Sequence, residues 1–125
     1  MLDYSIMKPE GILVLKPRAP LSKEDFGGLS AAVDSYLIDH TGLHGILIHS
    51  RRFPGWENFA GFTAHMHFVH DHHKRVERVA LVTDSPVAGM AEAFGKHFTS
   101  ADVKHFPFAA DAEALGWLGL RETCG

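Results

Sequence analysis

The chain has 125 residues, a length that suits one domain with one hydrophobic core. Hydrophobic residues make up 46% of it, which argues against disorder, and a net charge of −3 gives no general attraction to nucleic acid or anionic lipid. The single cysteine, Cys124, excludes a disulfide framework and a cysteine-based zinc site, and we interpret it as a bystander thiol. The stretch MLDYSIMKPEG lacks the basic and then apolar pattern of a secretory signal, and no apolar run approaches the roughly 18 residues that span a bilayer. We therefore expect a single cytoplasmic domain over residues 1–125, with peripheral membrane contact at most.

The first third of the chain predicts a hairpin followed by a helix. Tyr4 to Met7 and the apolar run Ile12 to Leu15 have the character of strands, and the turn signal Pro9-Glu10-Gly11 between them makes an antiparallel pair. Ser22, with Asp25 three residues later, is typical of a helix start. Apolar residues then recur at helical spacing to about His40.

The rest of the chain alternates between strands and helices. Strands are predicted at Gly45–His49, Arg78–Thr83 and Val103–Phe106, and helices at 57–74, 86–98 and Ala112–Leu118. Strands separated by helices should be parallel, with right-handed crossovers. The predicted fold is therefore an α/β layered domain with a sheet of about five mostly parallel strands, four to five helices and an antiparallel strand at one edge.

The stretch HMHFVHDHHK, residues 65–74, holds five histidines, and helical geometry tests whether they converge. With about 100° per residue, Phe59, Phe62, Met66 and Val69 fall on one side and predict the stripe that faces the core. His65 and His72 share a flank but are two turns apart. Phe68 points away from the stripe, so we expect it to be exposed or in contact with another surface.

Three interpretations of these histidines remain open: a metal site, a solvated or capping face and a pH-responsive surface. Only His67–His70 with Asp71, or His70–His73, has the spacing to hold one ion, and either pair needs further ligands, for which His44, His49 and His97 are available. No HExxH, GxGxxG, GxxxxGK[ST] or GxSxG pattern occurs, so we predict no catalytic residue and no cofactor.

Two stretches follow predicted parallel strands, at the sheet edge where ligands usually bind. The first runs from Ser50 to Asn58 and contains Arg51, Arg52 and Trp56; the second is Thr83 to Pro86. A loop with two arginines that leads into a helix N-terminus favours an anion, although two solvated arginines and an aromatic folded over the core give the same pattern.

Taken together, the hairpin, the apolar third strand, Phe53-Pro54-Gly55-Trp56-Glu57, RVALVTD at 78–84 and AEALGWL at 112–118 resemble the SpoIIAA-like family of small bacterial proteins, which look like STAS domains. The resemblance covers nearly the whole chain and implies a sheet of about five strands with four or five helices. It also implies two functions. The first is partner docking of the kind seen in anti-sigma-factor antagonists, with Ser50 and Ser85 as candidate phosphorylation sites, although the usual Asp-Ser turn is missing here. The second is lipid binding, as in the CRAL-TRIO (SEC14-type) lobe, where the second and third helices part around an apolar pocket.

The sequence favours a non-catalytic domain that binds a small apolar or amphipathic, lipid-like ligand between helices 57–74 and 86–98. Arg51 or Arg52 would meet an acidic head group, and the expected apolar lining is Trp56, Phe59, Phe62, Met66, Met90 and Phe94. The alternatives are a protein-docking module and a metal-dependent activity at His67, His70 and Asp71. We also expect a homodimer, from an exposed Phe68 and an apolar helix flank.

Overall fold

A computed structural model describes residues 2–7, 11–40, 42–52, 55–84 and 102–119 of the chain, and the fold is described for these residues. They form one five-stranded sheet with the strand order β1-β2-β3-β4-β5. The strands are β1 (Leu2–Met7), β2 (Ile12–Pro17), β3 (Leu43–His49), β4 (Val76–Val82) and β5 (Asp102–Phe106). The α-helices are α1 (Lys23–Leu37), α2 (Phe59–His72) and α4 (Asp111–Trp117), and 3-10 turns lie at His73–Arg75 and Phe108–Ala110.

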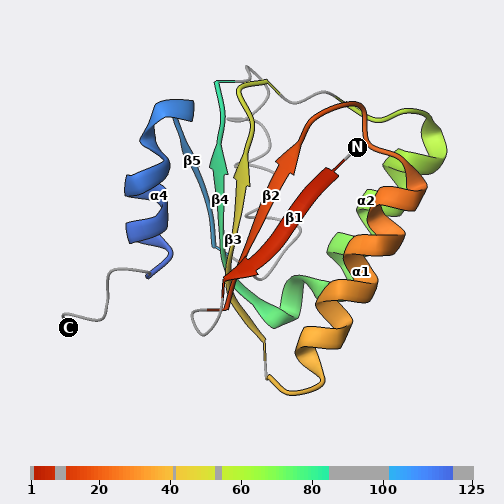
Figure 1. The fold of residues 1–125 in the computed structure, drawn as a ribbon, viewed down its shortest axis with the longest axis horizontal. Coiled ribbons are helices and arrows are strands. Elements are labelled where there is room, and N and C mark those ends of the chain that lie inside the picture. Colours follow the sequence, from red (N-terminus) through yellow and green to blue (C-terminus); the bar gives the residue numbers. More distant parts are fainter. Residues whose placement is uncertain (1, 8–10, 41, 53–54, 85–101, 120–125) are drawn as a thin grey trace.

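The sheet has the predicted topology. β1 pairs antiparallel with β2, and β2 to β5 are parallel neighbours in sequence order. Figure 1 shows α1 and α2 together on one face of the sheet and α4 on the opposite face. Because strand order never reverses, the described sheet has no switch point of the kind at which doubly wound folds open a ligand crevice.

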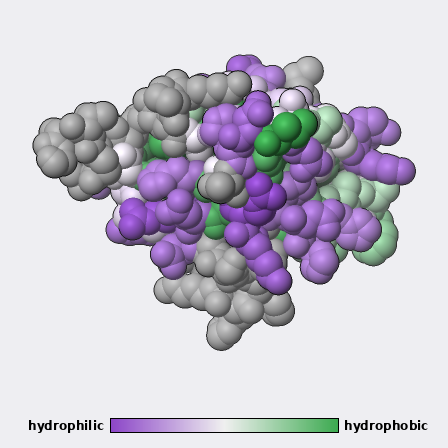
Figure 2. Space-filling view, turned by 90° about the horizontal axis from the view of Figure 1, so that it is seen from below, coloured by the Kyte–Doolittle hydropathy of each residue, from purple (hydrophilic) through white to green (hydrophobic). Residues whose placement is uncertain are grey.

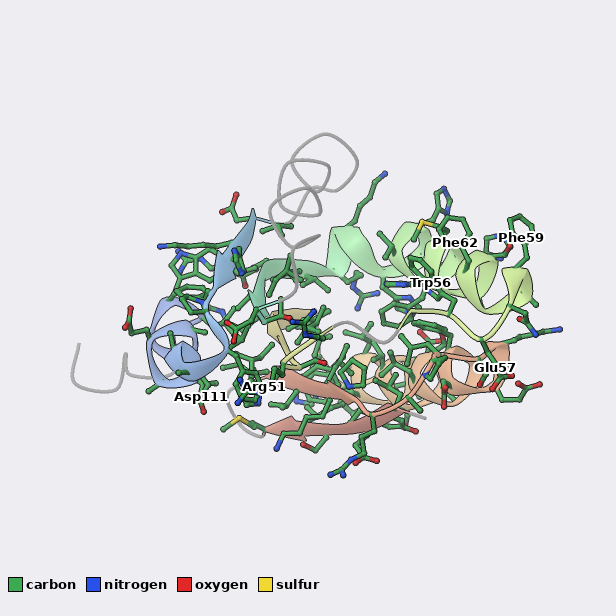
Figure 3. The ribbon with its side chains drawn as sticks, turned by 90° about the horizontal axis from the view of Figure 1, so that it is seen from above. Arg51, Trp56, Glu57, Phe59, Phe62 and Asp111 are labelled. Carbon is green, nitrogen blue, oxygen red and sulfur yellow. The ribbon has the colours of Figure 1, made fainter. Side chains whose placement is uncertain are left out.

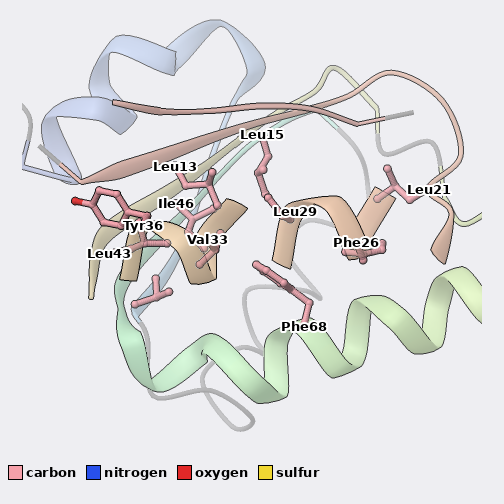
Figure 4. Packing of buried hydrophobic residues seen from close by; sticks show 11 residues of the cluster. Leu13, Leu15, Leu21, Phe26, Leu29, Val33, Tyr36, Leu43, Ile46 and Phe68 are labelled. Carbon is pink, nitrogen blue, oxygen red and sulfur yellow. The ribbon is translucent and has the colours of Figure 1, made fainter. Parts of the chain in front are cut away.

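Two hydrophobic clusters hold the layers together, one on each face of the sheet. The larger packs the sheet against α1 and reaches Phe68 of α2, as Figure 4 shows. The smaller joins the other face to α4, with Phe106, Ala114 and Leu118 among its members. Within the described residues, no helix is long and apolar enough to span a bilayer.

The start of α1 is set by local side-chain chemistry. Ser22 caps α1 through a complete capping box: its hydroxyl accepts from the Asp25 N–H, and the Asp25 carboxylate accepts from the Ser22 N–H. This start is confirmed, but α1 ends at Leu37, earlier than the predicted His40. The described residues contain three α-helices rather than four to five, and the helix predicted at 86–98 lies outside them.

The predicted core stripe of α2 is wrong in phase. Phe59 is 79% exposed and Met66 42% exposed, whereas Phe68, which we placed away from the core stripe, is 7% exposed. The buried residues of α2 are Gly61, Phe68 and His72, and Ala64 is packed against the core beside them. Small residues allow α2 to approach its neighbours closely on this side: a Cβ built on Gly61 would lie 2.5 Å from the carbonyl oxygen of Leu21. Close approach, and not the largest apolar side chains, sets which face turns inward.

Candidate functional site

Exposed large hydrophobic side chains gather on the outer side of α2 and the loop before it. Trp56 is partly exposed, and its indole packs edge-to-face on Phe62 at 4.9 Å between ring centroids. Phe59 lies beside Phe62 at 6.0 Å. Met66 continues the row one turn further along. Figure 3 shows Trp56, Phe59 and Phe62 gathered near the start of α2, and we call these four residues the outer face of α2.

Exposure makes this face unusual, because large apolar side chains of a soluble protein are normally exposed singly. Figure 2, seen from below, shows mostly hydrophilic side chains and a paler hydrophobic area at the side where α1 and α2 lie. The hollow of the described residues that lies between β5 and α4 does not border the outer face of α2. Phe59 and Met66 of this face are open to solvent.

The backbone around Trp56 is fixed by the segment that precedes α1. Leu21 donates its N–H to the Gly55 carbonyl at 2.9 Å, and Glu57 donates its N–H to the Leu21 carbonyl at 2.7 Å. These bonds form a parallel bridge between Leu21 and Trp56. The carboxamide oxygen of Asn58 accepts from the Gly61 N–H at 3.0 Å and caps the start of α2. The aromatic side chains thus project from a backbone that is held at several points.

His65 holds the Trp56 indole in place through a hydrogen bond. The indole N–H donates to Nδ1 of His65 at 3.1 Å, and the imidazole stacks on Phe26 of α1 at 4.8 Å between ring centroids. Burial lowers the pKa of His65 to about 4, so the ring is neutral at pH 7 and Nδ1 is free to accept. His65 is therefore a half-buried support for the partly exposed tryptophan rather than part of a solvated face.

His72 is a buried histidine, and it joins α2 to α1. Its Nδ1 lies 2.8 Å from the Phe68 carbonyl oxygen, and its Nε2 lies 2.9 Å from Oδ1 of Asp34 on α1. The ring thus lies between a backbone carbonyl of its own helix and a carboxylate of α1. A solvated face, which was one of the open interpretations, therefore does not describe His72.

The remaining histidines of α2 do not form a metal centre with other described residues. His70 and Asp71 lie 3.3 Å apart, and both are exposed, as is His67. No group of three or more His, Cys, Asp or Glu within the described ranges is placed to hold a metal ion. His97, one of the proposed further ligands, lies outside those ranges, as does the side chain of His73.

Arg51 belongs to a different site, at the carboxyl edge of the sheet. Its guanidinium lies 3.7 Å from Oδ2 of Asp84 and 4.6 Å from the centre of the Phe108 ring. The other carboxylate oxygen of Asp84 accepts from the Phe108 N–H at 3.0 Å, and His49 stacks on the Phe108 ring at 4.4 Å. Asp84 thus offsets the positive charge of Arg51, which we expected to meet an anionic ligand.

The structure does not bring Arg51 together with the outer face of α2. Figure 3 shows Arg51 toward the middle of the molecule, apart from Trp56, Phe59 and Phe62. Arg52 is exposed, and its carbonyl accepts from the Ser50 hydroxyl at 2.7 Å. Ser85, Met90 and Phe94, which complete the predicted phosphorylation and ligand sites, lie outside the described residues.

The sequence identified the aromatic residues but not His65 and Phe26 as the support of Trp56, nor Asp34 as the partner of His72. The signal was present in the spacing of Gly61, Ala64, Phe68 and His72, which follows a helical stripe rich in small residues. A stripe of that kind indicates the closely packed side of a helix, even where the opposite side is more apolar.

Comparison with known proteins agrees with the fold. An uncharacterised protein with a SpoIIAA-like fold from Shewanella loihica PV-4, known from a crystal structure, superimposes with a TM-score of 0.73 at 20% sequence identity. The match covers 94% of this chain and 93% of that one, and at this identity it shows the fold alone. No curated protein matches the chain significantly. The model of the SpoIIAA-like family matches residues 12–119, and the chain therefore belongs to the SpoIIAA-like family.

Proposed function

We propose that this protein is a non-catalytic binding module that takes a small apolar or amphipathic, lipid-like ligand on the outer face of α2. The observation that carries the proposal is the exposure of Phe59 and Met66 beside a partly exposed Trp56. An exposed apolar group of this size normally marks a surface that is covered in the working state. Membership of the SpoIIAA-like family supports a regulatory or interaction module at the level of the family.

The arrangement of Trp56 supports binding more than a purely structural role. A tryptophan that only filled space would be expected to pack into the core. Here the indole N–H is satisfied by His65 and the ring edge rests on Phe62, so the indole is held at the surface with its polar group already paired. A rigid aromatic of this kind offers apolar contact at little cost in side-chain entropy.

The head-group part of the proposal rests on Arg52, since Arg51 is engaged with Asp84 and Phe108. Arg52 is exposed in the loop before Trp56 and could meet a carboxylate or phosphate whose apolar chain lies along α2. A cytoplasmic location with peripheral membrane contact belongs to the same proposal.

Docking of a protein partner is the second candidate function, and the openness of the outer face of α2 favours it. An extended ligand pocket would be hollowed, whereas a partner helix or loop can cover an open row of side chains. The row Phe59, Phe62 and Met66 has the three- and four-residue spacing along which an apolar partner would lie.

Native mass spectrometry of protein purified without a metal-affinity step separates the two candidates. The proposal predicts an adduct of lipid mass that Phe59→Ser reduces severalfold. Ile38→Ser is the matched control, because Ile38 is 81% exposed at the end of α1, away from this face, and its removal should leave the adduct unchanged. A bare chain mass together with a co-purifying protein lost in Phe59→Ser would favour docking, and equal behaviour of both variants would contradict a role for this face.

A further inference from the structure

β5 is an edge strand of the sheet that the described residues form. β5 is the last strand of the sheet, and none of the described strands pairs with its far side. The Phe106 carbonyl accepts from the Thr83 N–H, so the backbone groups of Phe106 face β4. Because backbone direction alternates along a strand, Val103 and His105 turn their N–H and C=O groups outward. Such an edge is a template for another strand.

The two edge strands of the described sheet differ in charge pattern. β1, at the opposite edge, carries Asp3 and no basic residue, and Asp3 is paired with Arg18. β5 carries Asp102 and Lys104, which are both exposed and, among the described residues, form no ion pair. The two charges are two residues apart and so lie on the same face of the sheet. β5 alone therefore contains both halves of a cross-strand ion pair.

We propose that two copies of this chain associate by antiparallel pairing of their β5 strands about a twofold axis beside Val103. The two Val103 residues then exchange backbone hydrogen bonds. In this register Asp102 of each copy lies opposite Lys104 of the other, so symmetry forms the ion pair twice. A register centred on Lys104 would instead place the two lysines opposite each other, which is unfavourable.

A hollow beside this edge supplies further contact surface. It has a volume of about 540 Å³, is open to solvent, and lies between β5 and α4; its lining is Lys104, Phe106, Ala112, Glu113, Gly116 and Trp117. The Lys104 ammonium lies 5.1 Å from the Phe106 ring centre and 6.0 Å from the Trp117 ring centre. Pairing of a five-residue edge buries little area by itself, so a stable dimer also needs contact of this kind. A second copy seated on the β5 edge covers the hollow and supplies it.

This interface replaces the one predicted from the sequence. The expected dimer rested on an exposed Phe68, and Phe68 is buried between α1 and α2. The β5 edge is also separate from the outer face of α2, so the two proposals stand or fall independently.

Sedimentation equilibrium of charge variants tests the pairing. The wild type should form a dimer. Lys104→Asp should weaken it by about tenfold, because it replaces two opposite-charge pairs by two acidic pairs. The exchange Asp102→Lys with Lys104→Asp should restore the wild-type dissociation constant, since the swapped charges face each other again. Phe59→Ser serves as the control and should leave the dimer unchanged.

Three results would overturn the proposal. One is a wild type that stays monomeric over the whole concentration range. The second is a dimer that Lys104→Asp leaves intact or that the double exchange does not recover, with circular dichroism showing that the variants are folded. The third is loss of the dimer in Phe59→Ser, which would place the interface on α2.

Discussion

The more hydrophobic face of α2 is the exposed one, and the less hydrophobic face is buried. The inner face, which packs on α1 and the segment before it, carries two small residues, one phenylalanine and two histidines. The outer face carries a tryptophan, two phenylalanines and a methionine, of which Trp56, Phe59 and Met66 are exposed. Polar groups are tolerated inside because each has a partner: His65 accepts from Trp56, and His72 bonds Asp34 and the Phe68 carbonyl. The exposed apolar side chains of the outer face of α2 make it a candidate for binding.

The largest expected effect contrasts a phenylalanine from each face. Phe68→Ala should lower the free energy of unfolding by about 3–5 kcal/mol, because it leaves a cavity in the core shared with α1. Phe59→Ala should change it by at most about 0.5 kcal/mol, because the side chain is already in solvent. Urea denaturation measures both, and similar losses in the two variants would mean that the faces are wrongly assigned.

A methyl group added on the inner face should also destabilise the fold. Gly61→Ala places a Cβ against the rigid Leu21 carbonyl and should cost about 1–3 kcal/mol. Gly27→Ala on α1 is the matched control, since nothing lies within 4 Å of its added Cβ and alanine favours a helix. Denaturation should therefore show opposite signs for the two, and a stabilising Gly61→Ala would contradict the close approach.

Acid should weaken the fold through His65. The folded ring has a pKa of about 4, below the ordinary value of 6.5, so between these values the unfolded chain binds a proton that the folded chain does not. The stabilisation that comes from the neutral His65 is present above pH 6.5 and is lost as the pH falls. The free energy of unfolding should decrease by about 2 kcal/mol between about pH 7.5 and about pH 5. His65→Phe should remove this part of the pH dependence, and urea denaturation at the two pH values compares the slopes. An unchanged slope would show that His65 titrates normally.

The smallest expected effect concerns the bond between the helices. Asp34→Ala removes the partner of His72 and should cost about 1 kcal/mol. Asp39→Ala, at an exposed aspartate just past the end of α1, should stay within about 0.5 kcal/mol. Equal effects in thermal or urea denaturation would show that the contact contributes nothing measurable.

The sequence predicted those parts of the fold that depend on local chemistry and long apolar runs. The capping box at Ser22, the hairpin, the parallel strand order and the family resemblance are confirmed. The phase of α2 was wrong because a count of apolar residues cannot register close backbone approach, as at Gly61. Partners distant in sequence, such as Asp34 for His72, follow from the packing of α1 on α2 and leave no local signal.

The emission of Trp56 tests the central claim most directly. A Trp117→Phe background leaves Trp56 as the only tryptophan of the chain. Titration with fatty acids and with phospholipid vesicles should shift its emission to the blue in a saturable manner, since a bound apolar chain removes the indole from water. Phe59→Ser should weaken the response and Ile38→Ser should not. Emission that stays unchanged across both ligand classes would contradict the claim that the outer face of α2 binds a lipid-like molecule.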